Sequence, residues 1–199
     1  MKKLITLAIA AVLMLAGTNA HAQLSVGVGL DRVGNRTSSS SGNHSEGLFG
    51  FYFGGEYNFE LSYGFGVAPG IYYSTASKNK HRSGTRHKRN DQTINIPVNL
   101  NFSFDLDPEI RIVLMTGPVI GFGTVSRNIN GNIYTNLFED SDLSRFKLQW
   151  NFGVGADLMD RFRVSMGLAK GLNNRNNSKS IAGTIRSNDF HIGVSYLLF

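Results

Sequence analysis

The most highly charged stretch of the sequence is KNKHRSGTRHKRN, residues 78–90, which contains no acidic residue. Lys and Arg side chains bind phosphate and carboxylate groups through charge-assisted hydrogen bonds, and clustering them strengthens the local positive field. We therefore expect an anion-binding loop. The alternative is a solvated loop whose charge only prevents strand pairing. The cations of this candidate site are Lys78, Lys80, Arg82, Arg86, Lys88 and Arg89.

A second set of charged residues falls on the polar side of segments in which every second residue is apolar. Two acids and three bases near one end of such segments could form a salt-bridge network that fills a barrel interior. The alternative is a proton or ion path, but the interior of a small barrel has no spare width for one. We therefore favour a structural role. The members of this interior charge network are Glu56, Arg111, Asp157, Arg161 and Arg163.

Residue types suited to catalysis occur in no recognisable pattern. Nucleophilic catalysis pairs a nucleophile with His and a carboxylate, yet the chain has no Cys and its histidines fall in no such motif. The acidic run EDSD, residues 139–142, lacks the spacing of a calcium-binding loop. We therefore expect no enzyme activity, no catalytic residue, no metal site and no cofactor.

The amino-terminal residues indicate export. Two lysines and an apolar run over residues 4–15 precede the small-x-small pattern AHA, which ends at Ala22. This predicts a cleaved secretory signal peptide over residues 1–22 and a single mature domain over residues 23–199. An exported chain does not meet cytoplasmic nucleic acid, so we do not expect nucleic acid as a partner despite the net charge of +6.

Eight later segments alternate between apolar and polar residues with a period of two, which predicts β-strands. In one of them, Trp150 and Phe152 alternate with Asn151 and Gly153. Short turns near 60–62, 105–108 and 159–160 alternate with long polar loops at 34–46, 78–91, 126–145 and 173–188. This arrangement is typical of outer-membrane barrels, with the short turns in the periplasm and the long loops outside. The segments are 24–30, 49–59, 63–73, 94–104, 110–122, 147–158, 162–168 and 190–199.

The apolar face of these segments is expected to contact lipid. The opposite face is rich in Gly, Ala, Ser and Asn, which suit the narrow interior of an eight-stranded barrel. Phe, Leu, Ile and Tyr at every second position would overfill that interior. The sequence therefore predicts an all-β fold, an eight-stranded antiparallel transmembrane β-barrel of up-and-down topology. Because a closed barrel has no edge strand, bulges are expected at Pro69, Pro97 and Pro118.

Four pieces of the chain resemble the PorT-like, OmpX/OmpA-like group of outer-membrane β-barrel proteins: INIPVNLNFSF, GPVIGFG, WNFGVGADLMDRFRVSMGLAKGL and NDFHIGVSYLLF. The resemblance covers residues 23–199 and implies an eight-stranded barrel in the outer membrane of a diderm bacterium. It implies no shared catalytic residue. The terminal Phe199 resembles the aromatic that the barrel-assembly machinery reads, although Leu197 stands where a second aromatic is usual.

Together these features predict an integral outer-membrane barrel with a plugged lumen. It would act structurally or through its extracellular loops, in surface interaction or adhesion and in contact with lipopolysaccharide, a surface glycan or a protein ligand. One alternative is a narrow porin-like channel or a component of an outer-membrane transport or secretion machine. A further alternative is a secreted soluble barrel that binds a lipophilic ligand.

Overall fold

The computed structural model of the protein describes residues 22–39, 42–82, 85–130, 133–138, 143–177 and 183–198. The predicted signal peptide before Ala22, the acidic run at 139–142 and the terminal Phe199 lie outside the described residues. Over the described ranges, no helix is long and apolar enough to cross a membrane.

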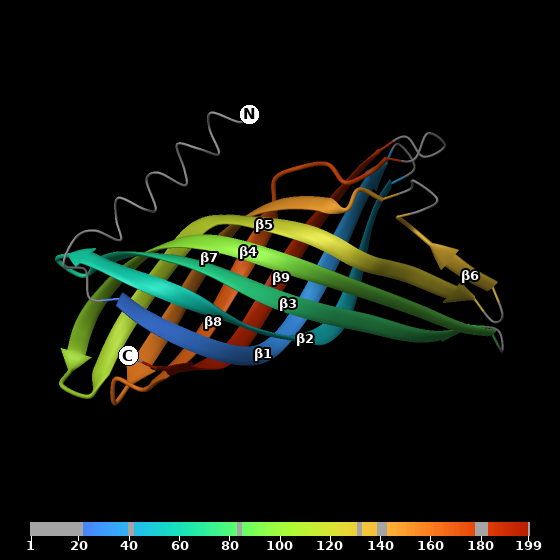
Figure 1. The fold of residues 1–199 in the computed structure, drawn as a ribbon. Helices are drawn as coiled ribbons and strands as arrows, with labels where there is room; N and C mark the ends of the chain where they lie inside the picture. The colour runs from blue at the N-terminus through green and yellow to red at the C-terminus, as the bar shows by residue number, and fades with distance from the viewer. Residues whose placement is uncertain are drawn as a thin grey trace.

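Nine antiparallel strands form one sheet that closes on itself, because β4 pairs with both β3 and β5. The short strand β6 pairs with β5 and stands outside the ring, so the other eight strands make the barrel (Figure 1). The predicted eight-stranded barrel is therefore confirmed. The strands are β1 (Ala22–Ser39), β2 (Gly42–Ser62), β3 (Phe65–Arg82), β4 (Thr85–Asp107), β5 (Ile110–Asn130), β6 (Ile133–Asn136), β7 (Phe146–Leu158), β8 (Phe162–Gly171) and β9 (Thr184–Leu197).

Large apolar side chains form a belt around the outside of the barrel. On β1, Val28 and Leu30 are 63% and 67% exposed, whereas Asp31 points inward and is 8% exposed. The same alternation holds on the other barrel strands, so the apolar face is the lipid face. The soluble-barrel interpretation is therefore wrong. Members of the belt include Phe51, Phe53, Ile71, Leu100, Leu114, Ile120, Phe152, Val154, Met166, Phe190 and Ile192.

Short turns join the strands at one end of the barrel, as predicted. Tyr63 and Gly64 have φ of 54° and 79°, and Met159 and Asp160 both have φ of 53°. Consecutive positive φ values are typical of the tight hairpins that match the strand twist. The third turn lies at 108–109. β1 begins and β9 ends at the same end of the barrel (Figure 1).

Two of the four predicted long loops, at 34–46 and 78–91, are instead largely continuations of the strands. β3 runs to Arg82 and β4 begins at Thr85, so the basic stretch is a hairpin in which Lys78 pairs with Arg89. β1 and β2 continue in the same way to Ser39 and Gly42. The loop prediction is wrong because both faces of a strand are wet beyond the lipid belt, so the apolar alternation that marks a strand disappears there.

Beyond the belt, the barrel wall divides into two sheets. β2 and β3 pair no further than Phe49 and Ser77, and β5 and β7 no further than Phe122 and Phe146. One outer sheet contains β9, β1 and β2, and the other contains β3, β4, β5 and β6. The outer ends of the two sheets diverge (Figure 1). The end of the lumen between them is called the outer mouth below.

The prolines do not produce the bulges that we expected. Pro69 pairs with Val98 and Pro97 pairs with Val119, with the register unchanged on either side. In the described strands, the register shifts of the β2–β3 and β4–β5 ladders lie instead near 60–62, 92–93 and 105–107. Proline removes a backbone donor without adding a residue to the strand, so the ladder can lose hydrogen bonds and still keep its register.

Candidate functional site: the lumen and the outer mouth

The inner end of the lumen is crossed by a buried ion-pair triad. Arg163 donates from Nε and Nη2 to the two carboxylate oxygens of Asp157, at 2.6 and 2.9 Å, and from Nη1 to Glu56 Oε1 at 3.0 Å. The three residues are 3%, 4% and 7% exposed. Charges so deeply buried are tolerated only when they are paired. The structure thus brings together three of the five residues of the predicted interior network.

The other two residues of that network lie elsewhere. Arg111 donates from Nε to Asp105 Oδ1 at 2.8 Å at the exposed rim, near the register shift at 105–107. Arg161 is exposed in the turn before β8, where its backbone N–H donates to the Leu158 carbonyl. Arg111 is on the inner face as predicted, opposite Asp157 in the β5–β7 ladder, but its side chain pairs with Asp105 instead of joining the triad. Arg161 was placed on the inner face because the sequence pattern assumed a regular strand up to the turn.

Further polar contacts line the lumen toward the outer mouth, each bridging two strands that have one strand between them. Lys147 Nζ and Gln149 Nε2 both donate to Asp189 Oδ2, at 2.8 and 2.9 Å. Ser74 Oγ donates to Asp31 Oδ2 at 2.8 Å. No site was predicted at these residues, because Asp31 and Asp189 fall just outside the apolar segments. Charged residues at inward positions were the signal that could have identified them.

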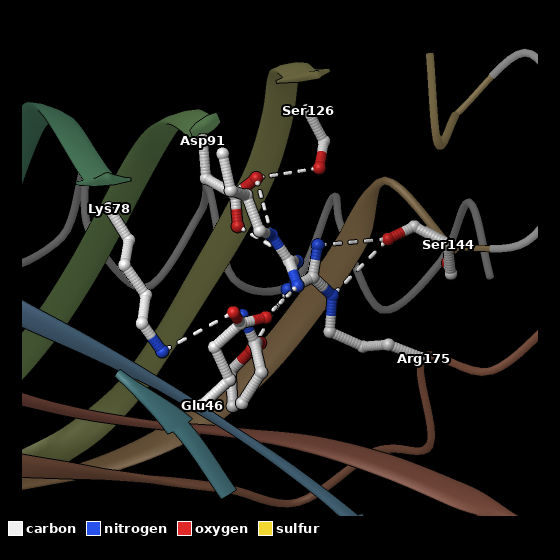
Figure 2. Close-up of polar contacts among 9 residues, drawn as sticks. Glu46, Lys78, Asp91, Ser126, Ser144 and Arg175 are labelled. Atoms are coloured by element: carbon white, nitrogen blue, oxygen red, sulfur yellow. Dashed lines mark hydrogen bonds and ion pairs between the residues drawn. The ribbon is translucent and has the colours of Figure 1, made fainter. Parts of the chain in front are cut away.

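The outer mouth contains an ion-pair cluster that links the two outer sheets, called the Glu46 cluster here. Glu46 on β2 accepts from Arg89 Nη1 on β4 at 2.8 Å and from Lys78 Nζ on β3 at 3.4 Å. Arg89 also bonds Asp91 at 3.1 Å, and Asp91 accepts from Ser126 Oγ at 2.6 Å (Figure 2). The cluster therefore joins β2 to β3 and β4 beyond the point where their backbones stop pairing.

The electrostatics of this cluster favour the charged form of its central acid. Burial alone would raise the pKa of Glu46, but the charges and hydrogen bonds of Arg89 and Lys78 outweigh burial. The pKa of Glu46 therefore lies below its ordinary value of 4.5. Because the acid is charged at neutral pH, Glu46 neutralises cations that we expected to be available to a ligand.

A second group closes the other side of the outer mouth. Arg175 donates from Nη1 to Ser187 Oγ at 2.8 Å and from Nε and Nη2 to the Ser144 carbonyl at 3.2 and 3.1 Å (Figure 2). Ser187 in turn donates to Asn35 Oδ1 at 2.8 Å. Arg175 is 5% exposed, and this burial lowers its pKa. The outer mouth is thus filled by side chains from both outer sheets and the segment after β8.

The predicted anion-binding residues occupy different environments. Lys78 and Arg89 point into the outer mouth and are paired with Glu46 and Asp91. Lys88 is half-buried and forms no ion pair with a described residue. Nothing is described of the side chains of the remaining cations, which are Lys80, Arg82 and Arg86.

Unpaired cations gather instead on the outward face of β8, β9 and β1, in what we call the outer-wall patch. All four side chains are exposed, and none forms an ion pair within the described part of the chain. Arg36 and Arg186 are directly opposite each other in the β1–β9 ladder. The patch was missed because its residues are dispersed over three strands and form no run in the sequence. Its members are Arg32, Arg36, Lys170 and Arg186.

The outer-wall patch borders the lipid belt. Leu168 pairs with Phe190, and Phe190 pairs with Arg32, so one row runs from apolar residues to a cation. A groove of about 730 Å³ follows this wall, and its lining includes Leu168, Phe190, Arg32, Arg36 and Lys170. The groove has hydrophobic side chains on the side of the lipid belt and cations toward the outer end of the strands. These match the two parts of a lipid molecule, its acyl chains and an anionic headgroup.

Comparison with known proteins agrees with this geometry. The family model described as "Outer membrane protein beta-barrel domain" matches residues 8–197. No curated protein matches the sequence. Among solved structures, the attachment invasion locus protein Ail of Yersinia pestis is similar with a TM-score of 0.50 and 11% identity, over 89% of this chain and 99% of Ail.

Two further solved structures are similar to this chain at lower TM-scores. Ail in complex with the heparin analogue sucrose octasulfate gives a TM-score of 0.48 and 12% identity, over 89% of this chain and 99% of that one. Neisserial surface protein A gives a TM-score of 0.47 and 16% identity, over 86% of this chain and 96% of that one. The chain belongs to the family of outer membrane protein beta-barrel domains, and it is an integral β-barrel of the bacterial outer membrane.

Proposed function

We propose that this barrel acts from the outer surface, by binding a phosphorylated glycolipid of the outer leaflet or an acidic glycan, and that it is not an enzyme. The observation that carries the proposal is the outer-wall patch, which holds four exposed cations and no ion pair with a described acid. Lipopolysaccharide, which has acyl chains below and phosphates above, fits this wall.

The two opposed arginines of the patch are the proposed binding site for a phosphate group. Like charges directly opposite each other on neighbouring strands destabilise a sheet. Arg36 and Arg186 stand in that relation. A phosphate between them would accept hydrogen bonds from both guanidinium groups and remove the repulsion.

A porin-like channel has less support. The Arg163 triad crosses the lumen, the Lys147–Asp189 pair bridges β7 and β9 along its wall, and the five side chains are at most 8% exposed. A solute would have to break these buried pairs in order to pass, at a cost of several kcal/mol per pair.

Binding to lipopolysaccharide vesicles tests the proposal. We expect the double variant Arg36→Ser and Arg186→Ser to bind more weakly than the parent at low salt. The parent's affinity should also fall as salt rises, because screening acts over about 8 Å at physiological ionic strength. Arg111→Ser, at the opposite rim, is the matched control and should bind like the parent. Equal affinity of the double variant and the parent would refute the patch as the binding surface.

The basic hairpin is tested as a separate arm of the same experiment. The variant with Lys80, Arg82 and Arg86 changed to Ser removes the cations at its tip. If only this variant loses binding, the ligand is held by the hairpin and not by the outer-wall patch. If both variants lose binding, the ligand spans the two outer sheets.

We also propose that the chain is exported by the signal peptide over residues 1–22 and assembled through recognition of Phe199. The sequence pattern supports both steps. Amino-terminal sequencing of the mature protein should begin at Gln23. Deletion of Phe199 should lower the amount of assembled barrel in the outer membrane. Membership of the PorT-like group, with a role in a secretion machine, would predict that loss of this chain blocks secretion; normal secretion would exclude it.

A further inference from the structure

The middle of the lumen contains a cavity of about 110 Å³ whose wall combines polar side chains with the apolar residues Pro97, Met115, Val119 and Ala169. It lies among the inward residues of all eight barrel strands, with the triad acid Glu56 at its wall on one side and Gln149 on the other. The remaining polar residues at its wall are Asp31, Tyr52, Tyr72, Asn95, Asn99, Asn151, Ser165, Asp189, His191 and Ser195.

Four oxygen atoms at this wall have no hydrogen-bond partner within the described residues. They are one carboxylate oxygen each of Asp31 and Asp189 and the amide oxygens of Asn95 and Asn151. Asp31, Asp189 and Asn151 are 8%, 7% and 5% exposed. Every one of these atoms is an acceptor, and leaving a buried acceptor unsatisfied is costly. The cavity is therefore suited to a hydrogen-bond donor or a cation.

The charges around the cavity do not balance. Asp189 is paired with Lys147 at 2.8 Å. Asp31 is bonded at 2.8 Å to the neutral Ser74 hydroxyl and has no ion pair with a described residue. His191 contacts Tyr52 ring to ring at 6.1 Å and likewise forms no ion pair with a described residue. The Asp31 carboxylate therefore has no counter-charge among these contacts, in an interior where unpaired charges are strongly disfavoured.

The triad next to the cavity does not supply the missing positive charge. Arg163 is already shared between Glu56 and Asp157, so two carboxylates face one guanidinium there as well. Arg175, further out, gives its hydrogen bonds to Ser144 and Ser187. Neither arginine therefore compensates the charge of Asp31 through a hydrogen bond or an ion pair.

We propose that the cavity binds one monovalent inorganic cation, Na⁺ or K⁺, held by Asp31, Asp189 and the two amide oxygens. Carboxylate and amide oxygens are the ligands that such hard cations prefer. A single positive charge would offset the carboxylate of Asp31, which forms no ion pair with a described residue. Among the described residues there is no group of three His, Cys, Asp or Glu side chains suited to a metal ion, which disfavours a transition metal. Water alone would satisfy the hydrogen-bond acceptors but would not neutralise the charge of Asp31.

The size of the cavity agrees with this assignment. A water molecule takes about 30 Å³ of liquid volume, so about 110 Å³ holds one ion with roughly two waters beside it. The proposal is independent of anion binding at the outer-wall patch, because it concerns the opposite face of the barrel wall. An experiment that refutes one of the two proposals therefore does not refute the other.

Unfolding of the vesicle-inserted barrel by urea tests the proposal. At constant ionic strength, the urea midpoint should rise when Na⁺ or K⁺ replaces tetramethylammonium, because a ligand that binds only the folded state stabilises it. Tetramethylammonium screens surface charges equally but is too large for coordination by these oxygens. Asp31→Asn should lose the response, and Asp105→Asn at the exposed rim should keep it. An unchanged midpoint in all three salts would overturn the proposal.

A direct measurement covers the case in which Asp31→Asn does not fold. Crystals of the parent protein grown with Rb⁺ should show an anomalous peak between Asp31 and Asp189. Absence of the peak, or neutralisation of the cavity by proton uptake with no dependence on the cation, would contradict cation binding.

Discussion

Arg163 on β8 and Asp157 on β7 are direct partners in the β7–β8 ladder, and their side chains share two hydrogen bonds of 2.6 and 2.9 Å inside the lumen. The third guanidinium nitrogen reaches across to Glu56 on β2 at 3.0 Å. One arginine therefore links strands on opposite sides of the barrel, and the side chains that close the lumen also bind its walls together.

Replacing Arg163 tests how much this link contributes to the free energy of unfolding. Arg163→Met leaves two buried carboxylates unpaired and should lower the free energy of unfolding by about 3–5 kcal/mol. The matched control is Arg111→Met, which breaks an exposed pair worth at most about 1 kcal/mol. Urea unfolding in vesicles measures both. Similar small losses for the two variants would show that the triad contributes little to stability.

The lipid face is tested at Val154, which is 40% exposed on the outside of β7. Val154→Arg should cost about 2–4 kcal/mol if the side chain lies near the bilayer midplane and less toward the interfaces. Val154→Leu keeps the face apolar and should fold like the parent. Folding yield into lipid vesicles is the measurement, and an unaffected arginine variant would reverse the assignment of the faces.

Two inward glycines should respond differently to Ala. A Cβ at Gly193 would lie 2.6 Å from the Val28 carbonyl and would overlap the Tyr52 hydroxyl, whereas a Cβ at Gly155 would lie 3.3 Å from its nearest neighbour, the Val164 carbonyl. We expect Gly193→Ala to destabilise the barrel by about 1–3 kcal/mol through overpacking. Gly155→Ala should have a clearly smaller effect. Thermal unfolding compares them, and equal melting temperatures would contradict a tightly filled lumen.

Acidic pH should weaken the ion pairs of Glu46 that hold the outer mouth together. Because the pKa of folded Glu46 is lowered, its contribution to stability is fully present above the unfolded value near 4.5 and is lost as pH falls through the folded pKa. Amide protection at the outer ends of β2 and β3, corrected for the pH dependence of intrinsic exchange, should therefore decrease below about pH 4.5. Glu46→Gln should exchange faster than the parent at pH 7, and the two should converge in acid. A constant difference would exclude Glu46 as the titrating group.

Much of the fold could be predicted from the sequence because lipid imposes a strict pattern. Where a strand crosses the belt, as at Trp150 and Phe152, the alternation fixes both its existence and its lipid face. Tight turns such as the one at Met159 and Asp160 were located for the same reason, since the alternation stops there.

The remaining features depend on tertiary contacts that no local pattern encodes. The outer halves of β3 and β4 were taken for a loop because both of their faces are wet. Arg161 was placed in the lumen although the turn carries it outside. The partner of Asp189 is Lys147, which is 42 residues away. Pairing at that separation follows only from the closed ring.

Planar-bilayer recording of the purified protein tests most directly the central claim, that a barrel closed by its own side chains acts from its outer surface. The ion pairs of Arg163 and Lys147 fill the lumen at two levels. We predict no stable conductance steps for the parent protein. Steady porin-like steps would contradict the account and would establish the barrel as a channel.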